Sequence, residues 1–84
     1  MVYQLVVTRR AARDIAQLTP EVRERLRAAL EKYREEPLAR ARKMVNSSLG
    51  GYRFRIGEYR VVFDLEGDHL VLLRVGHRRD IYRG

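Results

Sequence analysis

The Gly57-Glu58 pair constrains the fold of this 84-residue chain more than any other feature. On either side of it lie two runs, 52–56 and 59–65, in which apolar side chains recur at every second position, as on one face of a β-strand. A two-residue connection that begins with glycine is typical of a tight hairpin turn, and such a turn fixes the register of its strands. The sequence therefore predicts an antiparallel hairpin with one apolar face.

This register places two like charges opposite each other, Arg55 and Arg60, on the face that also carries Arg53. The other predicted pairs are Ile56 with Tyr59, Phe54 with Val61, Arg53 with Val62, and Tyr52 with Phe63. A like-charge pair costs a few tenths of a kcal/mol up to about 1 kcal/mol, and folding alone gives no reason for it. Residues that do not favour the fold are expected mainly at functional sites, so this like-charge pair indicates a functional role. Alternatively, the side chains splay into solvent and one pairs with Glu58 or Asp64.

Before the hairpin, the sequence predicts one strand and two helices. Residues 2–7 are rich in β-branched side chains and suit a strand. Thr8 and Thr19 are placed to cap the two helices, and the second helix should end near Glu36 because Pro37 disfavours a helical residue before it. The second helix has one apolar stripe, formed by Val22, Leu26, Ala29, Leu30 and Tyr33.

The remaining segments are a loop over 37–50 and a third strand of the C-terminal half over 70–75. For the pairing of strand 70–75 with strand 59–65, we favour the register that keeps Arg74 out of the core. In that register Val71, Leu73 and Val75 face the helices, while Leu70 and Leu72 lie on the outer face. The expected fold is a single α+β domain over residues 1–84. Two N-terminal helices pack on a largely antiparallel four-stranded sheet, in the order strand, helix, helix, strand, strand, strand.

Composition narrows the possible partners. The net charge is +7, and the excess lies in residues 37–84, where ten Lys and Arg face five Asp and Glu. This charge favours a polyanion such as nucleic acid or a ribosome, an anionic membrane surface, or an acidic protein. The chain has no cysteine and two histidines, a weak basis for a metal site. With no apolar stretch long enough to span a bilayer and no signal peptide pattern, we expect a cytoplasmic protein.

Two motifs, YRFRIGEYRVVF at 52–63 and VGHRRDIY at 75–82, give the chain a resemblance to the RelE/ParE superfamily of bacterial and archaeal toxins. The resemblance spans essentially the whole chain. It implies a small α+β fold and, for the RelE branch, a ribosome-dependent endoribonuclease (mRNA interferase) that inhibits translation. The alternatives are a ParE-like inhibitor of DNA gyrase and a catalytically weak or inactive homologue. The basic residues retained in the two motifs argue against the ParE-like alternative.

The resemblance also implies a catalytic site, in which basic residues flank the glycine turn and others follow the last strand. Its candidate residues are Arg53, Arg55, Arg60, His77, Arg78 and Tyr82. Arg79 is interpreted as a solvated charge. No metal ion, cofactor or small molecule is expected to take part.

Cleavage of RNA by its own 2′-hydroxyl requires a group that takes the hydroxyl proton and charges that stabilise the anionic phosphorus. Arginines suit the second task, because a guanidinium presents planar donors to phosphate oxygens and stays charged. The same property makes arginine a poor base, and Arg53 and Arg55 stand where the best-known relatives carry lysines. The candidate bases are therefore His77 and Tyr82. Alternatively, His77 ends a strand and Tyr82 stacks on a base or plugs the sheet edge.

The partners implied by the resemblance are a cognate antitoxin, the ribosome and mRNA. We expect the cationic face to attract an acidic or amphipathic antitoxin segment. Leu70 and Leu72, outward-facing in the favoured register, would give that segment an apolar contact.

Overall fold

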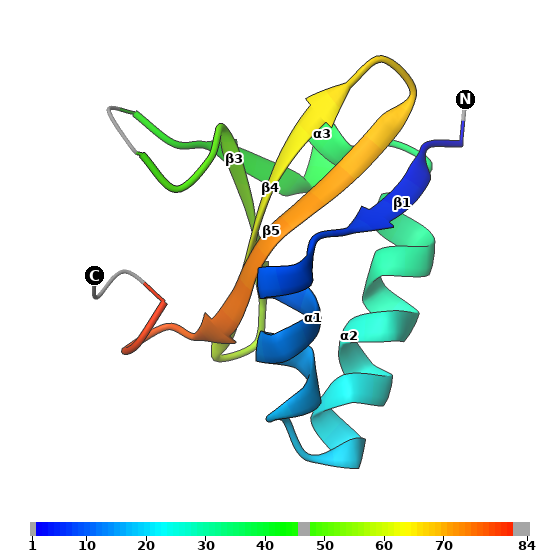
Figure 1. Ribbon diagram of the computed structural model, residues 1–84. Helices are drawn as coiled ribbons and strands as arrows, with labels where there is room; N and C mark the ends of the chain where they lie inside the picture. Colours follow the sequence, from blue (N-terminus) through cyan, green and yellow to red (C-terminus); the bar gives the residue numbers. More distant parts are fainter. Residues whose placement is uncertain (1, 46–47, 82–84) are drawn as a thin grey trace.

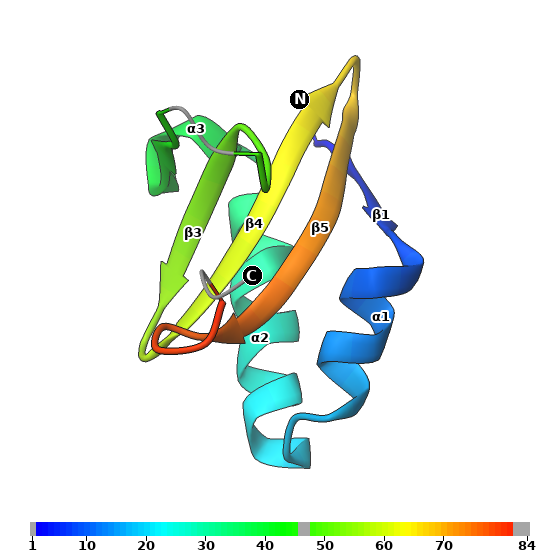
Figure 2. The ribbon, with the colours of Figure 1, turned by 60° about the vertical axis from the view of Figure 1, so that its left-hand side comes forward.

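The computed structural model describes residues 2–45 and 48–81, which form a sheet with α1 and α2 packed on one of its faces (Figure 1). The elements follow in the order β1 (Gln4–Val7), α1 (Arg9–Ala16), α2 (Pro20–Tyr33), α3 (Pro37–Arg40), β2 (Ala41–Lys43), β3 (Tyr52–Ile56), β4 (Tyr59–Glu66) and β5 (His69–His77). Figure 2 shows β3, β4 and β5 from the side away from the helices, which we call the outer face. None of the described helices has both the length and the apolar character needed to cross a bilayer.

The sheet has five strands in the order β1-β5-β4-β3-β2. β1 runs parallel to β5 and all other pairs are antiparallel, so the α+β class is confirmed and the expected four-stranded sheet is wrong by one strand. The additional strand is β2, in the segment predicted to be a loop, which also contains α3. Its three residues have no alternating apolar pattern. They form a strand because the edge of β3 offers them backbone partners, an interaction between distant segments.

The predicted helix caps are confirmed. The Thr8 hydroxyl accepts from Ala11 N–H at 3.2 Å, and the Thr19 hydroxyl accepts from Val22 N–H at 3.3 Å ahead of Pro20 in the first turn. Thr8 also donates its hydroxyl proton to the Leu72 carbonyl at 2.7 Å, which ties the start of α1 to β5. α2 ends at Tyr33 rather than near Glu36, with Arg34 as its C-cap.

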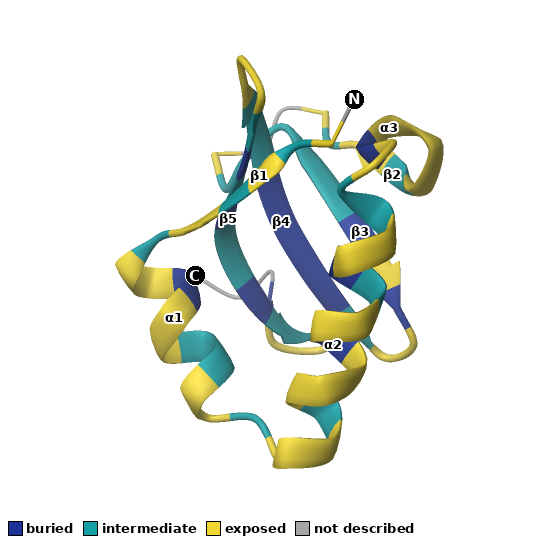
Figure 3. Cartoon of the chain, turned by 90° about the vertical axis from the view of Figure 1, so that its right-hand side faces the viewer, coloured by how far each residue is buried: buried dark blue, intermediate teal, exposed yellow. Residues whose placement is uncertain are grey.

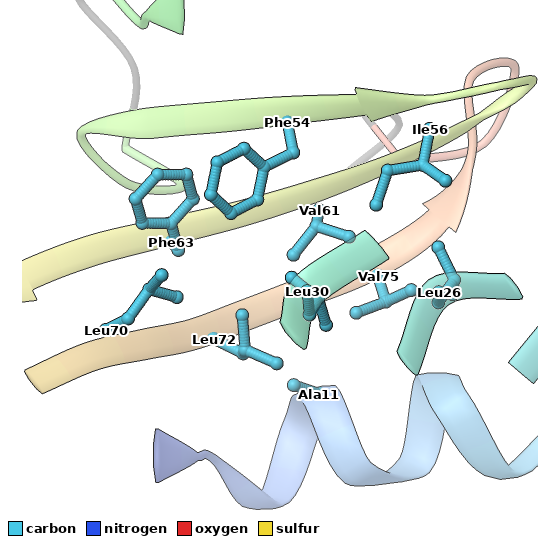
Figure 4. Packing of buried hydrophobic residues seen from close by; sticks show 10 residues of the cluster. All are labelled: Ala11, Leu26, Leu30, Phe54, Ile56, Val61, Phe63, Leu70, Leu72 and Val75. Atoms are coloured by element: carbon cyan, nitrogen blue, oxygen red, sulfur yellow. The ribbon is translucent and has the colours of Figure 1, made fainter. Parts of the chain in front are cut away.

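The hairpin register matches the prediction at every pair of β3 and β4, from Tyr52 with Phe63 to Ile56 with Tyr59. Its apolar face forms the core with α2, and Figure 3 shows the buried strands beneath helices whose outer sides are exposed. Phe54 and Phe63 stack with ring centroids 4.2 Å apart, and Tyr33 of α2 lies 5.0 Å from Phe54. Figure 4 shows Phe54 and Phe63 beside the aliphatic side chains of β5. The core thus depends on the alternation that the sequence displays.

The predicted facing of β5 is wrong for four residues. Leu70 and Leu72 are fully buried in the core against the helices, not on the outer face. Val71, between them, points the other way, and Leu73 lies beside Val62 close to Gly50. The cause is a β-bulge: Val62 pairs with Arg74 but Phe63 pairs with Leu72. Leu73 is the extra residue of the bulge, and it shifts the in-and-out alternation of β5 by one position. Val75 therefore faces the core as Leu70 and Leu72 do, and this facing was predicted.

Asp14 completes the edge of β5 where β1 has ended. β1 pairs only as far as Leu72, and beyond that point α1 lies along β5. The Asp14 carboxylate accepts from Val75 N–H and from Arg74 Nε, each at 2.9 Å. It therefore takes the place of a neighbouring strand and pairs an arginine that the apolar run of β5 would otherwise leave without a charge partner.

We expect Asp14→Ala to lower the free energy of unfolding by about 2 kcal/mol or more, because it leaves a sheet N–H and a half-buried guanidinium without their acceptor. Urea denaturation measures the change. Asp68→Ala, which removes an exposed carboxylate from the β4–β5 turn, is the control and should change stability far less. Equal effects of the two substitutions would contradict this role of Asp14.

Candidate functional site

Five arginines gather in one groove on the outer face of the sheet, which we call the arginine groove. Its volume is about 310 Å³, and it is lined by Arg53, Arg55, Arg60, Arg78 and Arg79. The first three alternate with core residues of β3 and β4, and the last two follow β5. Strand alternation thus places the charges opposite the helix-covered face.

Arg60 is the most constrained member of the groove. Only 6% of this residue is exposed, and its Nη1 donates to the carbonyls of Gly57 and Tyr59, each at 2.9 Å. Gly57 has a φ of 60°, in the left-handed region that the turn requires. The guanidinium is therefore attached to the backbone of the turn, which orients it before any ligand arrives.

Arg78 is held by the same turn. Its Nε lies 2.6 Å from a carboxylate oxygen of Glu58, and its N–H donates to the Glu58 carbonyl at 2.8 Å. About half of the Arg78 side chain is exposed, so its guanidinium can exchange partners with a phosphate. The hairpin turn thereby positions arginines from both the hairpin and the end of β5.

Arg55 is exposed and lies directly opposite Arg60 in the β3–β4 register, as predicted. The acidic neighbours proposed to relieve this pair are engaged elsewhere: Glu58 with Arg78, and Asp64 with Gly51 N–H at 2.6 Å. Within the described part of the chain, no acidic side chain pairs with Arg55. The like-charge pair therefore remains uncompensated on the Arg55 side, and a bound anion would relieve it.

The structure does not bring His77 into the arginine groove. His77 pairs with Tyr59 across β4 and β5, and their rings meet edge to face with centroids 5.6 Å apart. Both residues line a separate pocket that α1 also borders, while Arg60 and Gly76 form the adjacent pair on the other face. Tyr82 lies outside the described residues. Of the six predicted site residues, Arg53, Arg55, Arg60 and Arg78 share the groove.

Arg79 is the groove residue that sequence reasoning missed. It was interpreted as a solvated charge, yet it lines the groove next to Arg78. Its N–H donates to Nδ1 of His77 at 3.2 Å, which turns the chain after β5 and directs Arg79 toward the groove. The adjacent Arg78-Arg79 pair in the C-terminal motif was the available signal.

A family model described as the ParE toxin of type II toxin-antitoxin system, parDE, matches residues 5–82. The chain belongs to this family. It is 34% identical to Toxin RelG of Mycobacterium tuberculosis, with 99% of each chain covered, and 27% identical to Toxin RelE3 of Methanocaldococcus jannaschii, with 83% of this chain and 84% of the relative covered. The protein is therefore a type II toxin of the RelE/ParE superfamily.

Solved structures agree with this assignment. The toxin–antitoxin complex RelBE2 from Mycobacterium tuberculosis contains a chain with a TM-score of 0.83 and 29% identity, with 95% of both chains covered. The RelE–RelB complex from Pyrococcus horikoshii OT3 gives a TM-score of 0.76 at 20% identity, with 95% of this toxin and 99% of that chain covered, a likeness of fold alone. The five-stranded architecture is thus that of this superfamily.

The arginine groove can bind and stabilise phosphate, but its guanidinium groups do not transfer protons near neutral pH. Five permanent cations around one opening favour a phosphodiester backbone or a phosphorane-like transition state. Among the described residues, no three His, Cys, Asp or Glu side chains meet as metal ligands do. The charges that line this groove are those of its five arginine side chains.

We expect Arg55→Gln to raise the free energy of unfolding by a few tenths of a kcal/mol up to about 1 kcal/mol, because it removes the repulsion from Arg60. The gain should shrink at high salt, where the repulsion is screened. Urea denaturation at two salt concentrations measures it. Arg13→Gln removes the same charge from the exposed last turn of α1 and should give no gain. A loss of stability in Arg55→Gln would show that Arg55 makes a favourable contact.

Proposed function

We propose that this toxin is a RelE-like, ribosome-dependent endoribonuclease that cleaves mRNA and thereby inhibits translation. The convergence of five arginines on one groove supports this function best. The groove is open, as binding of a single RNA strand requires, and the hairpin turn orients two of its arginines, Arg60 and Arg78. A site built only to bind an acidic protein would have no need for a guanidinium as constrained as that of Arg60.

In the proposed reaction the 2′-oxygen attacks the adjacent phosphorus, and the bond from phosphorus to the 5′-oxygen breaks. The products are a 2′,3′-cyclic phosphate and a 5′-oxygen leaving group, which takes a proton from solvent to give a 5′-hydroxyl end. Arg60, held by two turn carbonyls, would stabilise the charge on the non-bridging oxygens. Arg55 and Arg78, which are more exposed, would grip the RNA backbone.

The proton on the 2′-hydroxyl needs a base other than arginine. His77 is poorly placed for this task, because the β4–β5 register directs it away from the groove. Tyr82, which lies outside the described residues, remains in the proposal as the second titratable candidate that the resemblance implies. We assign proton removal to Tyr82, without a metal ion.

We expect Arg78→Gln to reduce mRNA cleavage on translating ribosomes by about 10- to 100-fold, because a charge-assisted donor to the phosphate is lost. Mapping of cleaved mRNA ends with purified toxin measures the rate. The matched control is Arg13→Gln, which removes an equal charge from α1, outside the groove lining, and should cleave as the wild type does.

A wild-type protein that cut no mRNA in this assay would contradict the proposal. The ParE-like alternative predicts a different result, namely inhibition of DNA gyrase in a supercoiling assay without RNA cleavage. An inactive homologue would show neither activity and would leave growth unchanged when produced without an antitoxin. The two assays together separate the three functions.

We further propose that a cognate antitoxin binds this toxin, as the antitoxins named in the related complexes bind theirs. The predicted apolar contact through Leu70 and Leu72 on the outer face is wrong, because both residues lie in the core. The structure offers a different apolar surface: a cleft of about 460 Å³ between α1, α2 and β1, lined by Leu5, Val7, Ile15, Leu26 and Leu30 among others. The exposed Arg23 is part of the lining and suits an acidic residue of the antitoxin.

We expect Val7→Glu to weaken antitoxin binding at least 10-fold, because it places a charge in an apolar contact. Val6→Glu is the matched control: Val6 is 39% exposed and Val7 47%, but Val6 points to the opposite face of β1 and does not line the cleft. Calorimetric titration with the purified antitoxin measures both affinities. Equal losses in the two variants would exclude the cleft as the antitoxin contact.

A further inference from the structure

A second polar pocket lies at the edge of β5, one turn away from the arginine groove. Its volume is about 290 Å³, and its lining includes Gln17 at the end of α1, Tyr59, His77 and Asp80. The pocket forms because β1 ends opposite Leu72, which leaves the last part of β5 bordered by α1 and by the turn after His77. We call it the edge pocket.

Several hydrogen-bonding groups in the edge pocket are available to a ligand. His77 accepts from Arg79 N–H through Nδ1, so in the neutral ring the proton is on Nε2, which is a donor. Within residues 2–45 and 48–81, no hydrogen bond or ion pair engages that Nε2, the Gln17 amide or the Asp80 carboxylate. The neighbouring Asp14 and Arg74 differ in this respect, because they bind each other. The pocket thus combines a donor, an acceptor and an amide that provides both.

The chemistry of this lining fits a nucleobase better than a phosphate. The carboxylate of Asp80 repels anions but accepts from exocyclic amino groups. The rings of Tyr59 and His77 supply aromatic surface on which an unstacked base can pack. A volume of about 290 Å³ lies at the lower end of the range for small-molecule sites, which suits a single base rather than a larger ligand.

The edge pocket is connected to the arginine groove through four consecutive residues. His77 and Asp80 line the pocket, whereas Arg78 and Arg79 line the groove. The turn is firmly closed, because the His77 carbonyl accepts from Asp80 N–H at 2.9 Å and from Ile81 N–H at 3.0 Å. A single RNA strand whose phosphate lies in the groove can therefore place a neighbouring base around this turn.

We propose that the edge pocket binds a base of the mRNA next to the phosphate held by the arginine groove, and that it selects bases with an exocyclic amino group over uracil. This inference rests on the proposed function, since it assumes that RNA is the substrate. Asp80 accepts from the amino group, while Gln17 and Nε2 of His77 donate to ring nitrogens or carbonyl oxygens of the base.

The test measures binding without cleavage. Short RNA strands carrying 2′-O-methyl groups cannot undergo 2′-hydroxyl attack, and strands that differ only in one base are titrated into the toxin while NMR signals of Tyr59 and His77 are followed. We expect strands with adenine, cytosine or guanine to bind at least five-fold more tightly than the uracil strand. Asp80→Asn should abolish this preference, because an amide can donate to a uracil carbonyl. Gln17→Ala should weaken binding of all strands.

The controls are the same substitutions at exposed positions outside the pocket, Asp68→Asn and Gln4→Ala, which should leave binding and preference unchanged. Nucleoside monophosphates compared with inorganic phosphate separate base binding from phosphate binding: only the former should shift the Tyr59 and His77 signals. Unchanged base preference in Asp80→Asn, or no binding of any strand, would overturn the inference. A toxin that cleaves mRNA yet lacks this preference would refute the edge pocket alone, and base-selective binding without cleavage would refute the nuclease alone.

Discussion

The structure depends on the Gly57-Glu58 turn more than on any other local interaction. Its left-handed glycine closes the hairpin and sets the β3–β4 register. Its carbonyls then receive the guanidinium of Arg60 and the N–H of Arg78, and the Glu58 carboxylate holds the Arg78 side chain. One turn therefore determines both which residues form the core and where the cations of the site lie. A fold of this size has few other means to orient long side chains.

The two faces of the hairpin contribute to stability in opposite ways. On the helix side Phe54 and Phe63 stack and bury the sheet against α2, which stabilises the domain. On the outer side Arg55 and Arg60 repel each other, and the stability of the core offsets that cost. Strand alternation separates the arginines from the core residues, because successive side chains point to opposite faces. The site is therefore a cationic surface on a well-packed core, which suits a groove that binds an anion.

Sequence patterns predicted the elements that depend on neighbouring residues. The caps at Thr8 and Thr19 and the hairpin register follow from local geometry, and all are confirmed. Four groove arginines were named as site residues because the resemblance to the RelE/ParE superfamily implies them, and strand alternation places three of these, Arg53, Arg55 and Arg60, on one face. β2 could not be predicted, because its three residues become a strand only beside the edge of β3. The bulge in β5 was equally hidden, because a continuous apolar run is compatible with either facing of its residues.

The sequence by itself determined the charge of the chain, its hairpin and the alternation that separates arginines from core, since these follow from residue type and spacing. Only the tertiary structure decided which face His77 takes and that Arg79 joins the groove. Both depend on how β5 pairs with β4 after the bulge and on where β1 ends, contacts between segments far apart along the chain. Periodicity predicts that neighbours in a strand point to opposite faces. Long-range pairing decides which residues point to the helix-covered core and which to the outer face.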